Sequence, residues 1–267
     1  MDKKLDFSLF WGKYNIHVED HSFPHSFSKD RDNTLCILQR IQIKEKIDTL
    51  IAIDGKEFTT NVEIYDAQKL KEWVIFLEAW IDGVIVHNIH NIEKKIAIIL
   101  WIADCGGVVG ATSDGNSMFN IHAGYKGVFW WEGNSGIIAE CIKKMAGLGI
   151  DISEIATFLA PMAWNDFELP KAFVEKISSH FFTQYSQEKL MNFFQENENR
   201  DENGWEKWNL DLRKLMYALL KYHWIIHMTW FEENTTNPEN DWSSFRLFSN
   251  KVQPIDSRLS IAIANNR

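Results

Sequence analysis

The sequence predicts an α+β fold, with a mixed β-sheet core and flanking helices in a single domain. Short, almost continuous apolar runs such as 95–101 and 155–160 are typical of buried strands. Apolar residues three and four positions apart over 135–146 indicate an amphipathic helix. Between two apolar runs, Asp114-Gly115 provides residues that tolerate the positive φ of a tight turn, which predicts a β-hairpin.

Length and composition are those of a globular protein. A chain of 267 residues can bury a large core as one domain, and 45% apolar and 24% charged residues are ordinary values. The 12 Trp and 18 Phe favour a packed core or an aromatic-walled pocket. The 28 basic and 37 acidic residues give a net charge of −9, which argues against a nucleic-acid-binding surface with clustered Lys and Arg.

The cysteines and the first residues indicate a cellular compartment. Cys36, Cys105 and Cys141 are odd in number and lack the spacing of a disulfide framework, which favours a reduced, intracellular protein. The opening MDKKLD contains no apolar signal-peptide core, and no stretch reaches the length of a transmembrane helix. We therefore expect a cytoplasmic protein without a membrane partner.

In the first half of the chain, strands are expected to alternate with polar connections. Residues 1–34 form a polar, turn-rich segment, and 49–55 read as a buried strand that ends in a turn. The stretch 67–80 carries four apolar residues at helical spacing, which predicts an inserted amphipathic helix packed on the core. Those residues are Leu70, Trp73, Val74 and Leu77.

The hairpin brings together the first candidates for chemistry. Folding the chain about Asp114–Asn116 places Cys105 near Gly124, so Cys105 and His122 should lie at the open end of one hairpin. A thiolate and an imidazole there form either a soft metal site or a Cys/His nucleophilic pair. The alternative is a buried thiol beside a hydrogen-bonded core histidine.

The second half of the chain continues with helices and strands. The helix over 135–146 ends near Gly147 and carries Cys141 on its apolar face, where a free cysteine acts as a small core hydrophobe. Four more elements are expected: a strand at 155–160, a helix opened by Pro170, a helix ending at Tyr222 and a last strand at 260–264.

The hairpin stretch resembles the laccase-domain (multicopper polyphenol oxidase-like) family, whose bacterial members are described as purine nucleoside phosphorylases. The family signature is Thr-Ala-Asp-Cys, a hairpin, and then His-Ala-Gly-Trp-Arg-Gly. Here IADC at 102–105 and HAGYKG at 122–127 match in order and spacing. The resemblance extends over about 45–264 and is firmest between 96 and 170.

The resemblance also implies a metal site with one altered ligand. Where family members have Gln-Val-His-Gly, with that histidine as a metal ligand, this chain has Asp54 in Ala-Ile-Asp-Gly. Asp54, Cys105 and His122 would then hold Zn²⁺ with an open fourth position, with copper as the alternative ion. Bound zinc would make hydroxide available at neutral pH. His87 and His90 read as polar loop histidines, although one of them could replace the missing ligand.

The same family motifs assign further site residues. Lys126 stands in place of an arginine and Arg246 keeps a motif position, so both would bind phosphate. The alternatives are a solvated side chain for Lys126 and a surface ion pair for Arg246. Phe167 and Glu168 match a Tyr/Phe-Glu segment and would contact the nucleoside. The alternatives are a core position for Phe167 and a helix-start carboxylate for Glu168. Asp104 would orient the imidazole as a hydrogen-bond acceptor or cap the turn.

Together these features favour a metal-dependent enzyme acting on purine nucleosides, as a phosphorylase with phosphate at C1′ or an adenosine deaminase with water at C6. The expected partners are therefore a purine nucleoside and phosphate. A metal-free Cys105–His122 amidase-type hydrolase stays open. So does a non-catalytic binding protein, because Asp54, Lys126 and Leu247 depart from the family motifs. Phenol oxidation is not expected, since multicopper chemistry needs many more His ligands.

Overall fold

The three-dimensional structure is a computed structural model of the chain. It describes residues 4–9, 13–21, 38–39, 42, 45–54, 59–77, 80–129, 135–164, 167–181, 191–200, 204, 206–240, 242, 244 and 258–266.

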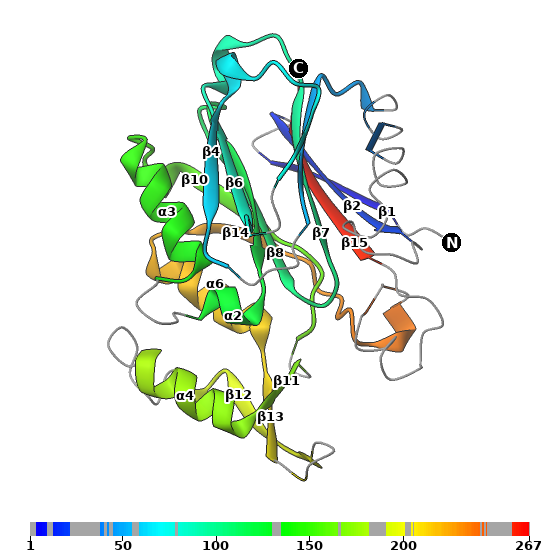
Figure 1. The fold of residues 1–267 in the computed structure, drawn as a ribbon, viewed down its shortest axis with the longest axis vertical. Coiled ribbons are helices and arrows are strands. Elements are labelled where there is room, and N and C mark those ends of the chain that lie inside the picture. The colour runs from blue at the N-terminus through cyan, green and yellow to red at the C-terminus, as the bar shows by residue number, and fades with distance from the viewer. Residues whose placement is uncertain are drawn as a thin grey trace.

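Two six-stranded sheets form the body of the molecule (Figure 1). In spatial order the first sheet contains β1 (Lys4–Leu9), β2 (Tyr14–His21), β15 (Arg258–Asn265), β7 (Ile96–Ile102), β3 (Thr49–Ile53) and β5 (Val74–Phe76). The second contains β14 (His227–Trp230), β10 (Ile155–Leu159), β8 (Gly106–Thr112), β9 (Met118–Ala123), β6 (Gly83–His87) and β4 (Val62–Asp66). Both sheets are mixed, because parallel pairs such as β3–β7 and β10–β14 adjoin antiparallel ones such as β8–β9.

The central core lies between the two sheets. Ile98 and Ile261 of the first sheet belong to the same buried cluster as Val109 and Phe158 of the second. Strands β7, β8 and β9 are buried along their whole length, since both of their faces are covered. This double burial explains the continuous apolar runs in the sequence, which a half-exposed strand would interrupt with polar residues.

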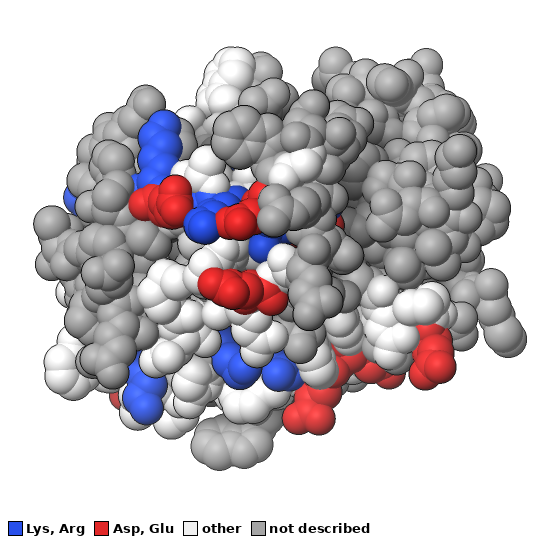
Figure 2. Space-filling model, turned by 90° about the horizontal axis from the view of Figure 1, so that it is seen from below, with Lys and Arg blue, Asp and Glu red and all other residues white. Residues whose placement is uncertain are grey.

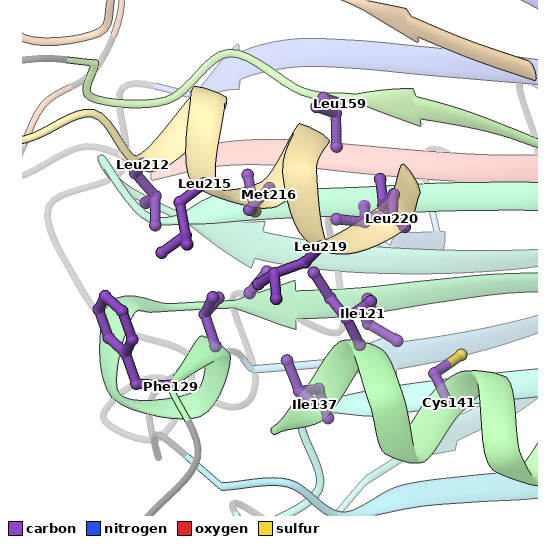
Figure 3. Close-up of a cluster of buried hydrophobic side chains, with 14 of the residues drawn as sticks. Ile121, Phe129, Ile137, Cys141, Leu159, Leu212, Leu215, Met216, Leu219 and Leu220 are labelled. Carbon is purple, nitrogen blue, oxygen red and sulfur yellow. The ribbon is translucent and has the colours of Figure 1, made fainter. Parts of the chain in front are cut away.

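Two helices cover the outer face of the second sheet (Figure 3). Helix α3 (Ile137–Gly147) directs Ile137 and Cys141 into this second core, and α6 (Leu212–Tyr222) contributes Leu215, Met216 and Leu219. Asp211 caps α6 by accepting a hydrogen bond from the Lys214 backbone N–H at 2.9 Å. The helices expected in these regions and the core position of Cys141 are confirmed.

A small sheet with one helix lies at one end of the molecule, at the bottom of Figure 1. Its strands are β11 (Phe167–Pro170), β13 (Glu206–Leu210) and β12 (Phe194–Arg200), and α4 (Lys171–Phe181) follows β11 directly. The remaining short elements are α2 (Tyr125–Val128) and the 3-10 turns η1 (Ala67–Lys69), η2 (Ile89–Asn91), η3 (Ile152–Glu154) and η4 (Pro238–Asn240). The predicted α+β class, with a mixed sheet core and flanking helices, is confirmed.

The helix expected over 67–80 is wrong for the described part of that stretch. The chain there forms the single turn η1 and then strand β5, which extends the first sheet by pairing parallel to β3. Val74-Ile75-Phe76 is a β-branched and aromatic run that suits a strand, and the edge of β3 offers it backbone partners. The apolar residues at 70, 73, 74 and 77 therefore have the spacing of a helix although the described chain there forms a turn and a strand.

The turn-rich segment expected over 1–34 is also corrected. Strands β1 and β2 form an antiparallel pair that continues the first sheet through β15. Tyr14, Ile16 and Val18 are buried at alternate positions, a period-two pattern hidden by the polar residues between them. Residues 22–34 lie outside the described part of the chain. Among the described helices, none is long and apolar enough to cross a membrane.

Candidate active site

The predicted hairpin is present and is formed by β8 and β9 at the centre of the second sheet. Gly106 lies opposite Ala123 and Gly107 opposite His122. Gly115 takes a φ of 84° at the turn, a conformation that favours glycine. The hairpin therefore brings Cys105 and His122 together at its open end, as the turn signal predicts.

His122 is held between a carboxylate and a thiol. Its Nδ1 lies 3.0 Å from Oδ1 of Asp82, and both side chains are buried. The half-buried Cys105 lies close enough to the same imidazole to influence its pKa. A buried imidazole flanked by a carboxylate and a sulfur is the arrangement of an activated Cys/His pair with an orienting acid.

Asp82 is itself fixed by the backbone around it. Its Oδ2 accepts a hydrogen bond from the Thr59 backbone N–H, and its own N–H donates to the Asn61 carbonyl at 3.1 Å. The His122 N–H in turn donates to the Asp82 carbonyl at 2.7 Å. Both the backbone and the side chain of Asp82 thus set the position of the imidazole.

The site favours the protonated imidazole. Burial by itself lowers the pKa of His122, but the hydrogen bonds and negative charges of Asp82 and Cys105 outweigh burial and raise that pKa above its ordinary value. By contrast, burial in α3 raises the pKa of the Cys141 thiol and keeps that cysteine neutral. Cys141 is thus a core thiol, whereas Cys105 is half-buried beside His122.

Of the two roles considered for Asp104, the contacts favour shaping of the turn over acceptance of a hydrogen bond from the imidazole. Asp104 is buried with a φ of 62°, and its Oδ1 accepts a hydrogen bond from the Thr235 hydroxyl at 2.8 Å. The Asp104 carbonyl accepts the Ala163 N–H at 3.0 Å. Asp104 thus shapes the turn that presents Cys105, while Asp82 contacts His122.

The expected three-ligand metal site does not assemble from the residues that the structure describes. Strands β3 and β7 run parallel with Ile53 opposite Leu100, so half-buried Asp54 lies at the same end of the first sheet as Cys105. Within the described ranges, however, no three His, Cys, Asp or Glu side chains form a group that could hold a metal.

The two loop histidines do not complete that site either. His90, in η2, interacts through Nδ1 with the Asn116 side chain at the closed end of the hairpin. His87 ends β6 and is only partly buried. A thiol and an imidazole are therefore the donor pair at the open end, and the described residues do not fit a zinc or copper site of three ligands.

The expected phosphate-binding residues have different outcomes. Lys126 is exposed in α2, next to the hairpin's open end, with its Nζ 5.8 Å from the centre of the Tyr125 ring. Arg246 lies outside the described residues. The structure thus places one of the two expected cations near the Cys105–His122 pair.

Glu168 and Phe167 belong to the small sheet. Glu168 accepts hydrogen bonds from Lys207 Nζ at 2.9 Å and from Asn197 Nδ2 at 3.0 Å. Phe167 is buried and its ring lies 5.3 Å from that of Tyr125. Figure 2 views the molecule from below, the end at which the small sheet lies, and shows acidic and basic side chains interleaved there. The structure therefore gives Phe167 a core position and Glu168 protein partners.

Asp82 is the site residue that the sequence interpretation missed. It lies in Ile81-Asp82-Gly83, a segment that resembles a family strand, but no role follows from a lone carboxylate before a strand. The only available signal was the position of this strand beside β9, which pairs Gly83 with Ile121. That pairing places Asp82 next to His122 and could not be deduced from spacing.

Comparison with known proteins identifies the family of the chain. A family model described as multi-copper polyphenol oxidoreductase laccase matches residues 42–252. The chain belongs to this family. No curated protein matches the sequence. The resemblance drawn from the hairpin motifs is therefore confirmed at the level of the family.

Solved structures of three bacterial proteins share this fold. YfiH of Bacillus licheniformis, a hypothetical protein, superposes with a TM-score of 0.70 at 13% identity, over 96% of this chain and 94% of its own. NMB0706 of Neisseria meningitidis superposes with a TM-score of 0.66 at 15% identity, over 100% of this chain and 99% of its own. YlmD of Geobacillus stearothermophilus superposes with a TM-score of 0.67 at 13% identity, over 96% of this chain and 93% of its own. At these identities the similarity shows the fold alone.

Proposed function

We propose that the protein is an enzyme of purine nucleosides, a phosphorylase that cleaves the glycosidic bond and can be tested for adenosine deamination in the same assay. The observation that carries the proposal is the contact of Cys105 and Asp82 with buried His122 at the hairpin's open end. The motifs that this site shares with the laccase-like family support the substrate class.

Phosphorolysis needs a proton donor for the leaving base. A phosphate oxygen forms a bond to C1′ while the bond from C1′ to the purine nitrogen breaks, and the purine leaves with that electron pair. Protonated His122 would donate a proton to the purine, as general acids do for poor leaving groups. Asp82 and Cys105 would keep the proton on His122 until then, because both raise its pKa.

A second reaction is favoured by one specific observation. Asp82, His122 and Cys105 occur in the order acid, imidazole, thiol, which also serves cysteine hydrolases. The thiolate would attack a carbonyl carbon, and the imidazolium would give its proton to the leaving amine. An amidase-type hydrolase is therefore the alternative function.

Incubation of the purified full-length protein with adenosine or inosine, with and without phosphate, tests the proposal. We expect phosphate-dependent release of adenine or hypoxanthine with ribose 1-phosphate, and loss of both in Cys105→Ala and His122→Ala. Cys141→Ala is the control for removal of a thiol, because Cys141 lies in α3. No adenine, hypoxanthine or inosine with any nucleoside would refute the proposal.

Two further measurements separate the alternatives. Hydrolysis of amide substrates with formation of a Cys105 thioester, trapped by hydroxylamine, would establish the hydrolase. Nucleoside binding without any product would instead indicate a binding protein. Metal analysis of protein purified without added metal, compared with Cys105→Ala, tests whether the thiol contributes to metal binding.

A further inference from the structure

The guanidinium of one arginine lies over the ring of one tryptophan, in segments that contact the neighbours of Cys105. The guanidinium carbon of Arg213 lies 3.8 Å from the centre of the Trp164 ring, and both side chains are half-buried. This cation–π contact holds the guanidinium plane in one orientation. Its N–H donors point outward in that plane and suit the paired oxygens of an anion.

The charge of Arg213 is not balanced within the described part of the chain. Arg213 makes no ion pair with any residue that the structure describes. The adjacent Asp211 pairs instead with Lys214 at 2.9 Å and caps α6. The carboxylate nearest in sequence is thus engaged by the neighbouring lysine.

The tryptophan contributes a second unsatisfied donor. The Trp164 indole N–H is buried and has no hydrogen-bond partner among the described residues. A buried N–H without a partner destabilises the fold, and such groups in native proteins call for an explanation. An anion beside the stacked guanidinium would explain both unsatisfied donors.

Contacts of neighbouring residues connect this pair to the segment around Cys105. Trp164 follows Ala163, whose N–H donates to the carbonyl of Asp104, the residue before Cys105. Arg213 lies one helical turn before Met216, the side chain that a Cβ atom on Gly106 would strike. Both members of the pair are therefore tied to the residues on either side of Cys105.

We propose that Arg213 and Trp164 form an anion subsite that binds phosphate beside the Cys105–His122 pair. This inference rests on the proposed function, since it supplies a position for the phosphate that attacks the nucleoside. A guanidinium presents two parallel N–H donors in a rigid plane that matches two phosphate oxygens, a geometry that the compact ammonium of Lys126 does not offer. The phosphate can be inorganic or belong to a nucleotide, because both present the same oxygens.

The test is a calorimetric titration of the full-length protein with inorganic phosphate. We expect Arg213→Gln to weaken phosphate binding about tenfold or more, as loss of a charged hydrogen-bonding partner does, and Arg213→Lys to restore part of the affinity. Lys214→Gln is the matched control. It removes a charge from the same helical turn, but that side chain is 59% exposed and already paired with Asp211.

A second variant tests the indole, and kinetics locate the subsite. Trp164→Phe keeps the aromatic ring but removes the N–H, so phosphate affinity should fall by a smaller factor than in Arg213→Gln. In phosphorolysis assays, Arg213→Gln should raise KM for phosphate and leave KM for the nucleoside within about twofold. Competition by adenosine monophosphate stronger than that by inorganic phosphate would identify a nucleotide as the source of the anion.

The possible outcomes separate this inference from the proposed function. Phosphate binding that depends on Arg213, without turnover of any nucleoside, would support the subsite and refute the phosphorylase. Nucleoside cleavage with an unchanged KM for phosphate in Arg213→Gln would do the reverse. Equal loss of phosphate affinity in Arg213→Gln and Lys214→Gln would also overturn the subsite, because a general charge effect would then be responsible.

Discussion

The carboxylates at the two ends of the β8–β9 hairpin differ in where their hydrogen-bond partners come from. At the closed end, Asp114 accepts hydrogen bonds from the Asn116 N–H at 2.8 Å and from the Thr112 hydroxyl at 2.5 Å. At the open end, the partners of Asp82 and Asp104 are His122 and Thr235, 40 and 131 residues away in sequence. The Asp114 carboxylate is thus satisfied within its own turn, whereas the two carboxylates at the open end find these partners only in the assembled fold.

This difference separates stability from chemistry within one hairpin. Local hydrogen bonds at the turn fix the register of β8 and β9, and that register decides whether Cys105 meets His122. The carboxylate at the open end is enclosed and fixes the imidazole, while Asp114 is exposed to solvent. We therefore expect substitutions at the open end to change turnover most and substitutions at the closed end to change stability most.

Removal of the Cys105 thiol should have the largest effect. Cys105→Ala deletes the group that interacts with His122, and we expect turnover of whichever substrate is found to fall by about a thousandfold or more. Because Cys105 is only half-buried, the melting temperature of the variant should differ from that of the unmodified protein by a few degrees at most. Steady-state kinetics and circular dichroism measure the two effects. A melting temperature that collapses while turnover persists would reverse the comparison.

The next largest effect is expected from Asp82→Asn, which neutralises the carboxylate but preserves its size. The imidazole then loses the negative charge that orients it and favours its proton, so kcat should fall about ten- to a hundredfold with little change in KM. Nitrogen NMR of labelled histidine should show an altered His122 ring.

Asp104→Asn is the matched control for that variant. It neutralises an equally enclosed carboxylate whose partner is Thr235, and asparagine also tolerates the positive φ found there. We expect a lower melting temperature but an unchanged His122 ring signal. If both variants alter that signal alike, Asp82 has no special role in positioning the imidazole.

The sequence could predict whatever is encoded locally. The hairpin, the core strands and the position of Cys141 follow from turn chemistry and from apolar runs, and the structure contains all of them. The helix expected over 67–80 fails because Val74-Ile75-Phe76 finds an open sheet edge at β3, which no local pattern reveals.

The candidate site divides along the same line. Cys105 and His122 are joined by one tight turn and could be paired from the sequence. Asp82 could not, because it reaches His122 only through the pairing of β6 with β9. Arg213 and Trp164 meet across 49 residues of sequence, in a contact between a loop and α6 that requires the tertiary fold.

A smaller effect is expected at the turn glycine. Gly115→Ala forces a side chain into a φ of 84°, which should lower the free energy of unfolding by about 1–2 kcal/mol. Turnover measured well below the melting temperature should be unchanged, since Gly115 lies at the far end of the hairpin from Cys105. Gly147→Ala is the control: it ends α3 with nothing within 4 Å of its new Cβ atom, so stability should stay the same or rise slightly.

The smallest effect is expected from Asp114→Ala. The substitution removes an acceptor for the Asn116 N–H and the Thr112 hydroxyl, and because the side chain is exposed, water replaces part of that loss. Unfolding in urea should therefore show a loss of only about 1 kcal/mol. Asp114→Asn keeps an acceptor oxygen in the same place and should recover most of that loss. If Asp114→Ala lowers kcat as much as Asp82→Asn does, the two ends of the hairpin are not divided between stability and chemistry.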